Sequence, residues 1–338
     1  MSEGMLAAVM DHPGQPLRIA QVPRPAPGPG KILIRLETSG VCHTDVHIWQ
    51  GHVSADPAPS ILGHEGVGRV VALGAGVTDW AVGDRAGAAW LHDTCGTCAE
   101  CRSGHESFCQ NQRAHGLQVP GTFAEYVVAD ARFAARVPPG AATELAPLMC
   151  AGLTALGALE QADLRAGDCC AIFGCGGLGQ YAVQLARRRG ADVIAVDRDP
   201  GKLAMSVGLG AARALNSADP VPLATARASA DVCINFAPTP ATWAPMVAMI
   251  RPRGRIVAAA MVSAPVPLDQ EWLTATGVTI TGTSVGTRAQ MAELMAIQAR
   301  APLTANITEI GLGDVTDALG ALAAGSAEGR YCIRFPSA

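Results

Sequence analysis

Residues 169–179, with the sequence Cys169-Cys170-Ala171-Ile172-Phe173-Gly174-Cys175-Gly176-Gly177-Leu178-Gly179, decide the fold of the second half of the chain. The apolar run at their start is typical of a strand buried on both faces, and a helical stretch over residues 178–189 follows. The pattern G-x-G-x-x-G lies between them. Its glycines permit a tight turn, a close backbone approach to a pyrophosphate and close packing of helix on strand. The sequence therefore predicts a dinucleotide-binding turn formed by Gly174, Gly176, Gly177, Leu178 and Gly179.

The strand expected after this helix ends in Asp197, 18 residues beyond Gly179. A carboxylate at this place accepts hydrogen bonds from the hydroxyls of an adenosine ribose and repels a 2′-phosphate, which favours NAD over NADP. Arg198 stands beside it, and an arginine there accommodates the phosphate, so NADP remains an alternative. The other alternative is an ordinary βαβ turn with an exposed aspartate.

The two halves of the chain carry different strand patterns. Residues 1 to about 150 are punctuated by proline and glycine between short β-rich runs, which is typical of an irregular β domain such as a barrel. After residue 151, apolar runs alternate with helical stretches, which predicts a parallel sheet covered on both faces. The expected strands are 31–36, 68–73, 123–128, 169–173, 193–196, 232–236, 255–259, 278–281 and 331–335, and a further helix is expected over 289–300.

The composition indicates a folded protein and excludes several classes. The 338 residues include 25 Lys+Arg and 29 Asp+Glu, a formal net charge of −4, and 49% are hydrophobic. Such a chain is too apolar for disorder, and its charge offers no footprint for nucleic acid. No apolar stretch approaches the roughly 20 residues of a membrane helix, and residues 1–4 lack the basic head of a secretory signal. We expect a cytoplasmic protein with neither nucleic-acid nor membrane partners.

Four of the 11 cysteines cluster at Cys95, Cys98, Cys101 and Cys109, within 15 residues. In a reducing compartment, clustered cysteines bind metal more often than they form disulfides. Four thiolates on a short loop suit a closed tetrahedral zinc site, which leaves no position for substrate and is therefore structural. An iron–sulfur cluster and four free thiols are the alternatives.

A second set of candidate metal ligands, Cys42, His64 and Cys150, is scattered along the chain. Two thiolates and one imidazole form an open zinc site with a fourth position for water or substrate. Taken singly, however, a buried cysteine is usually a small apolar filler. Sequence spacing leaves open whether the three residues converge.

The combination and order of the motifs resemble those of the zinc-dependent medium-chain alcohol dehydrogenases over nearly the whole chain. The motifs that carry this resemblance are Cys42-His43-Thr44-Asp45, Gly63-His64-Glu65-Gly66-Val67-Gly68, the four-cysteine lobe, Cys150-Ala151-Gly152-Leu153-Thr154, Gly174 to Gly179, and Ser284-Val285-Gly286-Thr287-Arg288. Within the family, the sequence is most similar to the yeast and bacterial class, which is usually tetrameric. The resemblance implies a homo-oligomer, with a tetramer favoured and a dimer as the alternative.

The resemblance also implies a fold in which an α/β unit interrupts a β unit. A GroES-like β-barrel catalytic domain is expected over residues 1–151, with the structural zinc lobe at about 92–112. A Rossmann-fold dinucleotide-binding domain is expected over 152–285. Residues 286–338 should return to the catalytic domain.

Roles for individual residues near the catalytic zinc follow from the same resemblance. Cys42, His64 and Cys150 should ligate this ion. Asp45 should orient His64 through a hydrogen bond, and Glu65 should lie against the zinc. The alcohol proton should pass from Thr44 through the cofactor ribose to His47.

Cofactor contacts are implied for residues of both domains. His43 should face the pyrophosphate, Thr154 the nicotinamide side of the cleft, and Lys202 the adenosine ribose, as Asp197 does. Arg288 should contact the cofactor at the domain junction. The implied cofactors are NAD and two zinc ions per chain, one catalytic and one structural.

The implied activity is reversible hydride transfer between a primary alcohol and NAD, which gives an aldehyde and NADH. Trp49, Trp90 and Met261 align with residues of the substrate pocket, where bulky side chains favour small alcohols; the alternative is that the tryptophans merely fill core. The rival functions are an NADP-linked cinnamyl or aromatic aldehyde reductase, a zinc-free quinone reductase and a non-catalytic NADH-binding zinc protein. The remaining histidines, expected on the surface or in loops, are His12, His52, His92, His105 and His115.

Overall fold

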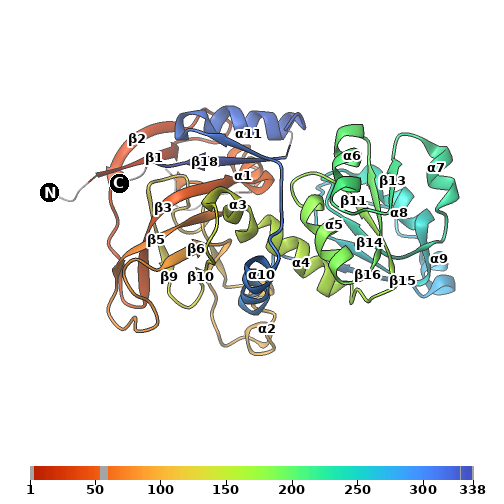
Figure 1. Cartoon of the computed structure of the whole chain (residues 1–338), viewed down its shortest axis with the longest axis horizontal. Coiled ribbons are helices and arrows are strands. Elements are labelled where there is room, and N and C mark those ends of the chain that lie inside the picture. Colours follow the sequence, from red (N-terminus) through yellow and green to blue (C-terminus); the bar gives the residue numbers. More distant parts are fainter. Residues whose placement is uncertain (1–3, 54–59, 328, 337–338) are drawn as a thin grey trace. The chain divides into compact units, whose positions relative to one another are not determined.

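The computed structural model describes residues 4–53, 60–327 and 329–336 (Figure 1). The chain folds as two compact units, each with its own hydrophobic core. Unit 1 comprises residues 1–153 and 287–338, and unit 2 comprises residues 154–286. These limits lie within two residues of those expected from the sequence.

Unit 1 is a β unit whose central strand is β3 (Lys31–Val41). This strand pairs antiparallel with β5 (Gly66–Leu73), with β9 (Tyr126–Asp130) and with β18 (Arg330–Arg334), so the last strand of the chain lies beside one of its first. The largest sheet has the order β10-β6-β5-β3-β18-β17, with β9 off this path. The other strands of unit 1 are β1 (Gly4–Met10), β2 (Arg18–Pro23), β4 (Ser60–Ile61), β6 (Arg85–Ala88), β7 (Leu91–Asp93), β8 (Arg113–Ala114), β10 (Ala135–Arg136) and β17 (Ile307–Ile310).

Strand β3 is longer than the six residues expected for it. It extends to Val41 through a segment that contains buried polar residues. Thr38 and Ser39 are fully buried, although their side chains suggest a turn. The Thr38 hydroxyl donates to the carbonyl of Ile333 at 2.7 Å, and the Ser39 hydroxyl lies 2.6 Å from that of Thr122. These partners come from distant segments, so the local sequence does not reveal that the two hydroxyls are satisfied.

Unit 2 contains the predicted parallel sheet, with the order β13-β12-β11-β14-β15-β16. Its middle strands are buried on both faces, as residues 193–196 of β12 show, and such strands need helices on each side. The strands are β11 (Cys169–Phe173), β12 (Asp192–Asp197), β13 (Arg213–Asn216), β14 (Ala230–Asn235), β15 (Ile250–Ala258) and β16 (Thr279–Gly282).

Helices connect the strands in both units. Those of unit 1 are α1 (His43–Trp49), α2 (Ala99–Arg102), η1 (Glu106–Phe108), α3 (Ala142–Leu145), η2 (Ala146–Met149), α10 (Arg288–Arg300), η4 (Leu312–Asp314) and α11 (Val315–Ala324). Helix α4 (Ala151–Gln161) contains the boundary between the units, and those of unit 2 are α5 (Gly179–Arg188), α6 (Pro200–Gly208), α7 (Pro220–Thr225), η3 (Pro240–Thr242), α8 (Trp243–Met249) and α9 (Gln270–Thr276).

None of the helices in the described residues is by itself long and apolar enough to cross a membrane. One pair bent by 45°, residues 142–149 with residues 151–161, meets the length and composition criteria together. The apolar side chains of this pair are core residues, because Leu148, Leu156 and Leu159 have no exposed surface.

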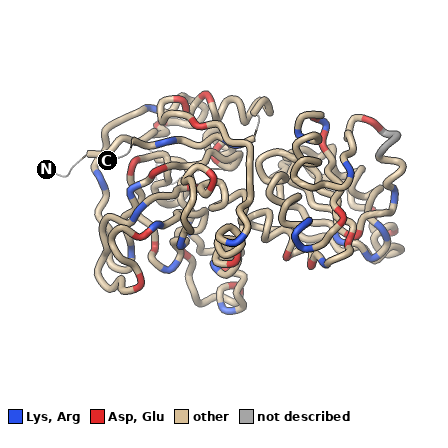
Figure 2. Tube along the Cα trace, viewed as in Figure 1, with Lys and Arg blue, Asp and Glu red and all other residues tan. Residues whose placement is uncertain are grey.

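Charged residues of both signs are interspersed along the two units (Figure 2). Several form ion pairs, such as Arg18 with Asp11 at 2.7 Å and Arg255 with Asp168 at 2.6 Å. Positive and negative side chains are therefore both present throughout the described parts of the two units.

Candidate active site and metal centres

A buried cluster in unit 1 gathers Cys42, His64, Glu65 and Cys150, which come from three separate segments. Cys42 immediately precedes α1, His64 and Glu65 lead into β5, and Cys150 lies between η2 and α4. All four residues are buried, and their candidate ligand atoms lie within 4.8 Å of one another. The three predicted ligands of the catalytic metal are thus brought together by the fold.

The geometry of this cluster fits a zinc ion. The sulfurs of Cys42 and Cys150 lie 3.9 Å apart, and tetrahedral zinc with Zn–S bonds of about 2.3 Å separates two sulfurs by about 3.8 Å. The Nε2 atom of His64 is buried and has no hydrogen-bond partner among the described residues. Buried polar atoms are rarely left without a partner, so a cation between the two sulfurs and this nitrogen accounts for all three donors.

Asp45 holds the cluster in place from the first turn of α1. One carboxylate oxygen accepts the backbone N–H of Cys42 at 2.9 Å. The other accepts the Nδ1–H of His64 at 3.0 Å and the N–H of Gly63 at 3.1 Å. In the neutral imidazole, a proton on Nδ1 of His64 leaves Nε2 with a lone pair that it presents to the cluster. The geometry is that expected of a residue that orients a ligand.

Glu65 forms a buried ion pair with Arg330 of β18. The Oε1 atom of Glu65 has no hydrogen-bond partner among the described residues. Burial raises the pKa of this carboxyl to about 7, against the opposing charge of Arg330. Gly40 makes room for the side chain, because a Cβ there would lie 2.0 Å from the Glu65 carboxylate. Sequence reasoning missed Arg330, since the two partners are 265 residues apart.

Electrostatic interactions in the cluster favour the ionised form of one cysteine. The hydrogen bond from Cys150 and the neighbouring His64 lower the pKa of Cys42 well below its usual value. Burial alone would lower the pKa of His64, but the charge and hydrogen bond of Asp45 outweigh it and raise the pKa. The surroundings of Cys42 therefore favour its thiolate form, the form that binds metal.

The predicted proton-transfer residues lie along α1, next to the cluster. The hydroxyl oxygen of Thr44 lies 3.7 Å from the Cys42 sulfur. His43 and His47, four residues apart on the helix, contact each other edge to face with ring centroids 5.1 Å apart. Both histidines are half-buried. Burial lowers the pKa of both imidazoles.

The three predicted pocket residues have different surroundings. The Trp90 ring stands edge to face against the His64 imidazole, with centroids 5.1 Å apart, so it lies beside the cluster. Trp49 packs against the core of unit 1, and its indole N–H donates to the carbonyl of Gln15 at 2.7 Å. Met261 belongs to unit 2, where its side chain is 52% exposed. Of the three, the structure places Trp90 at the cluster.

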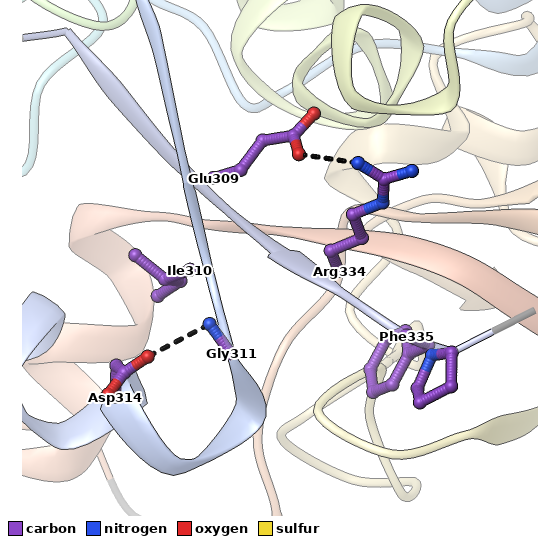
Figure 3. A pocket seen from close by; sticks show the side chains of 7 residues that line it. Glu309, Ile310, Gly311, Asp314, Arg334 and Phe335 are labelled. Carbon is purple, nitrogen blue, oxygen red and sulfur yellow. Dashed lines mark hydrogen bonds and ion pairs between the residues drawn. The ribbon is translucent and has the colours of Figure 1, made fainter.

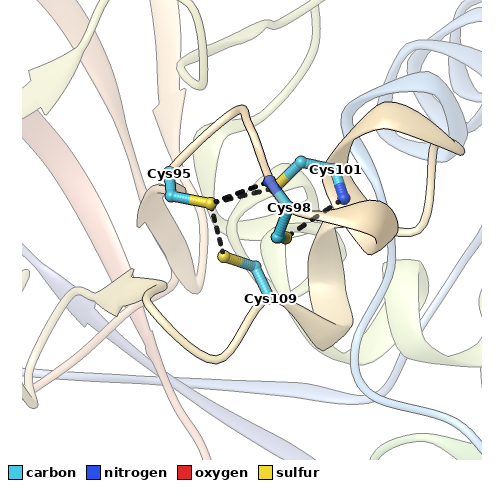
Figure 4. Close-up of side chains that lie close together, drawn as sticks. All are labelled: Cys95, Cys98, Cys101 and Cys109. Carbon is cyan, nitrogen blue, oxygen red and sulfur yellow. Dashed lines mark hydrogen bonds between the residues drawn. The ribbon is translucent and has the colours of Figure 1, made fainter.

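The four lobe cysteines come together between β7 and β8 (Figure 4). The sulfur of Cys95 lies 3.6 Å from that of Cys109 and 3.9 Å from that of Cys101, close to the separation that tetrahedral zinc requires. The backbone N–H of Cys98 is directed at the Cys95 sulfur at 3.4 Å. Such bonds, together with that from Thr97, lower the pKa of Cys95 to about 6. The donor set fits a structural metal.

Two of the histidines expected on the surface or in loops are buried next to the lobe, so the expectation of a surface position was wrong for both. His92 and His115 are 4% and 1% exposed. Their rings contact each other at 3.1 Å, Lys31 Nζ lies 3.3 Å from His92, and His115 Nδ1 lies 2.7 Å from the carbonyl of Ala89. Because each ring nitrogen has a partner supplied by another segment, the buried imidazoles are satisfied in a way that local sequence does not show.

Arg288, predicted to contact the cofactor, is held within unit 1 by the lobe. Its backbone N–H and its Nε both donate to the buried carboxylate of Glu106 at 3.0 Å. The guanidinium also lies over the ring of Phe133, 4.4 Å from its centroid. Glu106 of η1 is therefore a positioning residue that the sequence analysis missed.

The glycine-rich turn of unit 2 has the geometry of a dinucleotide site. Gly174 has a positive φ of 88°, and a Cβ at Gly179 would lie 2.2 Å from the Gly174 carbonyl, so both positions require glycine. A Cβ at Gly176 would meet nothing within 4 Å, so the backbone there is open to a ligand. Helix α5 follows, and no side chain caps its N-terminus, whose positive dipole end suits an anion.

Asp197 lies at the end of β12 and is already partly engaged. One carboxylate oxygen accepts the N–H of Cys175 at 2.7 Å, and the other accepts the N–H of Asp199 at 3.0 Å. Each oxygen keeps a second lone pair for a ribose hydroxyl. Lys202 lies on α6 and Thr154 on α4. The predicted residues of this site thus occupy the ends of strands and starts of helices, where such ligands bind.

A pocket of about 480 Å³ in unit 1 contains none of the predicted site residues. Its charged groups are satisfied internally (Figure 3): Glu309 pairs with Arg334 at 2.9 Å, and Asp314 accepts the N–H of Gly311 at 2.9 Å. The side chains of Glu309, Arg334 and Asp314 are thus engaged within unit 1.

Two family models match the chain, one in each half. Residues 28–139 match the "Alcohol dehydrogenase GroES-like domain", and residues 177–300 match the "Zinc-binding dehydrogenase" family. The chain is similar to the alcohol dehydrogenase of Moraxella sp. strain TAE123, with 37% identity over 336 residues that cover 98% of this chain and 99% of the relative.

Solved structures share the same fold. An acetophenone reductase from Geotrichum candidum, solved in complex with NAD, has a TM-score of 0.90, 30% identity and 99% and 98% coverage of the two chains. A thermostable alcohol dehydrogenase from Pyrobaculum aerophilum, solved with cobalt and zinc bound, has a TM-score of 0.91, 30% identity and 98% and 100% coverage. The expected combination of a GroES-like β unit with a Rossmann-type unit is therefore confirmed.

Proposed function

The chain belongs to the zinc-type medium-chain alcohol dehydrogenases, and from that premise we propose that it oxidises small primary alcohols to aldehydes reversibly, with NAD⁺ as hydride acceptor. The observation that carries this proposal is the buried meeting of Cys42, His64 and Cys150, with one unpartnered nitrogen between two sulfurs. Two thiolates and one imidazole leave a fourth position for a substrate oxygen.

We propose that these three residues hold a catalytic zinc ion and that the four lobe cysteines hold a structural one. Zinc supplies Lewis acidity, which lowers the pKa of an alcohol hydroxyl so that it ionises near neutral pH. Asp45 keeps the His64 nitrogen aimed at the site, and the lowered pKa of Cys42 favours the thiolate that zinc needs. Glu65, which lies among the candidate ligands, is paired with Arg330, so its carboxylate is not left as an unpaired charge in the interior.

The chain's own residues remove the alcohol proton in this proposal. The Thr44 hydroxyl, beside the Cys42 sulfur, can accept a hydrogen bond from the alcohol and donate its own proton. His47 lies further along the same helix and holds the proton on its way to solvent. Burial lowers the pKa of His47, so its neutral form is available to accept a proton at neutral pH.

We propose that the cofactor is NAD and that unit 2 binds it at Gly174, Gly176, Gly177, Leu178 and Gly179. Bound NAD⁺ accepts the hydride, and the protein supplies orientation. Asp197 supports NAD because its carboxylate repels a 2′-phosphate. Arg198, exposed beside it, is the feature that favours NADP. Further contacts are proposed for His43, Thr154, Lys202 and Arg288.

The preference for small alcohols rests on Trp90, whose ring lies against the ligand His64. A bulky ring so close to the cluster limits the length of a bound chain. Trp49 and Met261 remain proposed pocket residues. Rates on alcohols of increasing length test this point: the Trp90→Ala variant should accept longer alcohols than the wild type, and a wild-type preference for aromatic alcohols would contradict it.

We further propose that the protein is a homo-oligomer, with a tetramer favoured, and that it acts in the cytoplasm. The likeness to the yeast and bacterial class supports the first point. Light scattering of the purified protein tests it, since a monomer at micromolar concentration would exclude the tetramer.

The proposed reaction is tested by assaying a panel of alcohols and aldehydes with NAD and with NADP, alongside zinc analysis. Two zinc ions per chain and NADH formation from ethanol are expected. Faster turnover of cinnamyl alcohol with NADP would indicate the aromatic reductase. One zinc ion per chain without turnover would indicate a non-catalytic NADH-binding protein.

A further inference from the structure

A second histidine lies against His47 at the solvent side of α1. The Nδ1 atoms of His47 and His52 are 3.4 Å apart, and the ring centroids are separated by 5.7 Å. His47 is half-buried, whereas His52 is exposed. The two imidazoles therefore form a continuous contact from the half-buried side of α1 to the solvent.

The turn that ends α1 fixes this contact. Gly51 adopts a positive φ of 77° and donates its N–H to the carbonyl of Ile48 at 3.0 Å. The N–H of His52 donates to the carbonyl of His47 at 2.9 Å. These two bonds form a Schellman motif, which places the second residue after the C-cap, here His52, beside the third residue from the helix end, here His47. That contact is usually apolar, but here both positions are histidine.

Two imidazole nitrogens at this separation interact favourably only when one carries a proton and the other presents a lone pair. Burial lowers the pKa of His47, and the neighbouring imidazoles of His43 and His52 lower it further, against the raising effect of Cys42. Two other elements that bear titratable side chains pack on α1. Helix α11 carries Asp317, and the loop after β1 carries Asp11 and His12. A proton that reaches His47 is therefore readily passed on.

We propose that His52 is the positioning and proton-accepting partner of His47, completing a two-histidine path from the active site to solvent. The inference rests on the proposed function, because it assigns the exit of the alcohol proton. His47 takes up a proton at Nε2 and gives the Nδ1 proton to Nδ1 of His52, which then releases its Nε2 proton to water. One proton enters and one leaves, and neither ring keeps a charge. Water, which reaches the exposed His52, restores the starting tautomers.

A purely structural role for His52 makes a different prediction. The turn is held by backbone hydrogen bonds and by Gly51, none of which involves the His52 side chain. Replacing this side chain should therefore leave the fold intact. The variant His52→Gln keeps polar atoms of similar reach but cannot titrate.

The test is single-turnover oxidation of ethanol by zinc-loaded protein in weak buffer, with NADH formation and proton release followed together, the latter by a pH indicator. In His52→Gln, proton release should slow by about three- to tenfold, less than the 10²–10⁴-fold contribution of a general acid–base group. Added imidazole should restore it. The imidazole of His52 lowers the pKa of His47, so its loss should raise this pKa. The rise should be seen both in the pH profile and in an NMR titration of substrate-free protein.

His12→Gln is the matched control, since His12 is also exposed but has no contact with His47 in the described structure. It should match the wild type. If His52→Gln releases protons at the wild-type rate and shows an unshifted His47 titration, the two-histidine path is wrong while the proposed function stands. If the wild type forms no NADH from any alcohol, the proposed function fails and this inference fails with it.

Discussion

The two cysteine clusters of unit 1 are built in opposite ways. The lobe takes four sulfurs from 15 consecutive residues, and three of the four are half-exposed. The other cluster takes its candidate ligands from segments separated by 22 and 86 residues, and every candidate ligand is buried. Local chain geometry and a metal can define the lobe, whereas only the folded β unit can define the buried cluster. A metal should therefore hold the lobe together, whereas the fold holds the buried site ready for a metal.

The supporting bonds show the same contrast. In the lobe, backbone N–H groups of neighbouring residues are directed at the sulfurs, as from Cys101 to Cys98 at 3.5 Å. In the buried cluster, the Asp45 side chain accepts hydrogen bonds from the imidazole of His64 and from the backbone N–H groups of Cys42 and Gly63. Loss of a lobe cysteine should thus affect stability, and loss of a buried ligand should affect chemistry.

The largest expected effect is on turnover in Cys42→Ser. Activity should fall at least about a thousandfold, because several kcal/mol of charge stabilisation is lost at about 1.4 kcal/mol per factor of ten. Zinc analysis should show one ion fewer per chain, with the lobe ion retained. Cys332→Ser, at a buried cysteine outside both clusters, is the control and should remain active. A fully active Cys42→Ser would contradict the ligand assignment.

The next effect is on stability in Cys98→Ser. Metal binding is coupled to the folding of such loops, so the melting temperature should fall by about 5–10 °C, roughly 2–4 kcal/mol for a unit of this size. Limited proteolysis should cut within residues 94–112. Turnover per intact molecule should change little. Cys169→Ser, a half-buried cysteine of unit 2, should lower the melting temperature much less.

A smaller effect is expected for Asp45→Asn. Residues that orient a metal ligand typically contribute about 10–100-fold in metal affinity or activity. Competition with a chelator should show zinc lost from the buried site first, whereas the wild type retains it. Asp269→Asn, the same change at the N-cap of α9, should leave zinc affinity unchanged; equal zinc affinity in Asp45→Asn would show that Asp45 does not orient His64.

The smallest effect is the acid sensitivity due to His92 and His115. Burial lowers their pKa values to about 3 and about 4. Between pH 6.5 and 4 the unfolded chain therefore binds more protons, and stability falls as the pH falls. From pH 7 to 5.5 each histidine should cost about 1 kcal/mol of unfolding free energy. Urea denaturation of His92→Gln should show a shallower acid slope, with profiles parallel to the wild type above pH 7. An unchanged acid slope in the variant would refute this assignment.

The sequence predicted those features that depend on interactions between residues close together in the chain. Strand β11 spans the residues expected for it, and α5 and α10 begin within one residue of their expected starts. The lobe could be predicted because its spacing alone brings the sulfurs together. The glycine-rich turn could be predicted because its glycines are required by close contacts within a single βαβ unit.

The features that could not be predicted from the sequence depend on partners that lie far apart in the chain. The buried positions of His92 and His115 depend on Lys31 and on backbone carbonyls from other strands. Arg330 gains its role from a carboxylate 265 residues earlier. The convergence of Cys42, His64 and Cys150 was predicted only from the family resemblance. The spacing of these residues in the sequence could not predict it, because only the folded sheet brings their segments together.

The pairing of β18 with β3 has a consequence for protein synthesis. Unit 2 is one contiguous segment, so all of its strands have left the ribosome when residue 286 has emerged. Strand β18, which carries Arg330, is made after unit 2, and until it has emerged β3 lacks this neighbour and Glu65 lacks its counter-charge. During synthesis, the early β segments of unit 1 should therefore form only a partial sheet with an exposed edge at β3, while unit 2 can already fold.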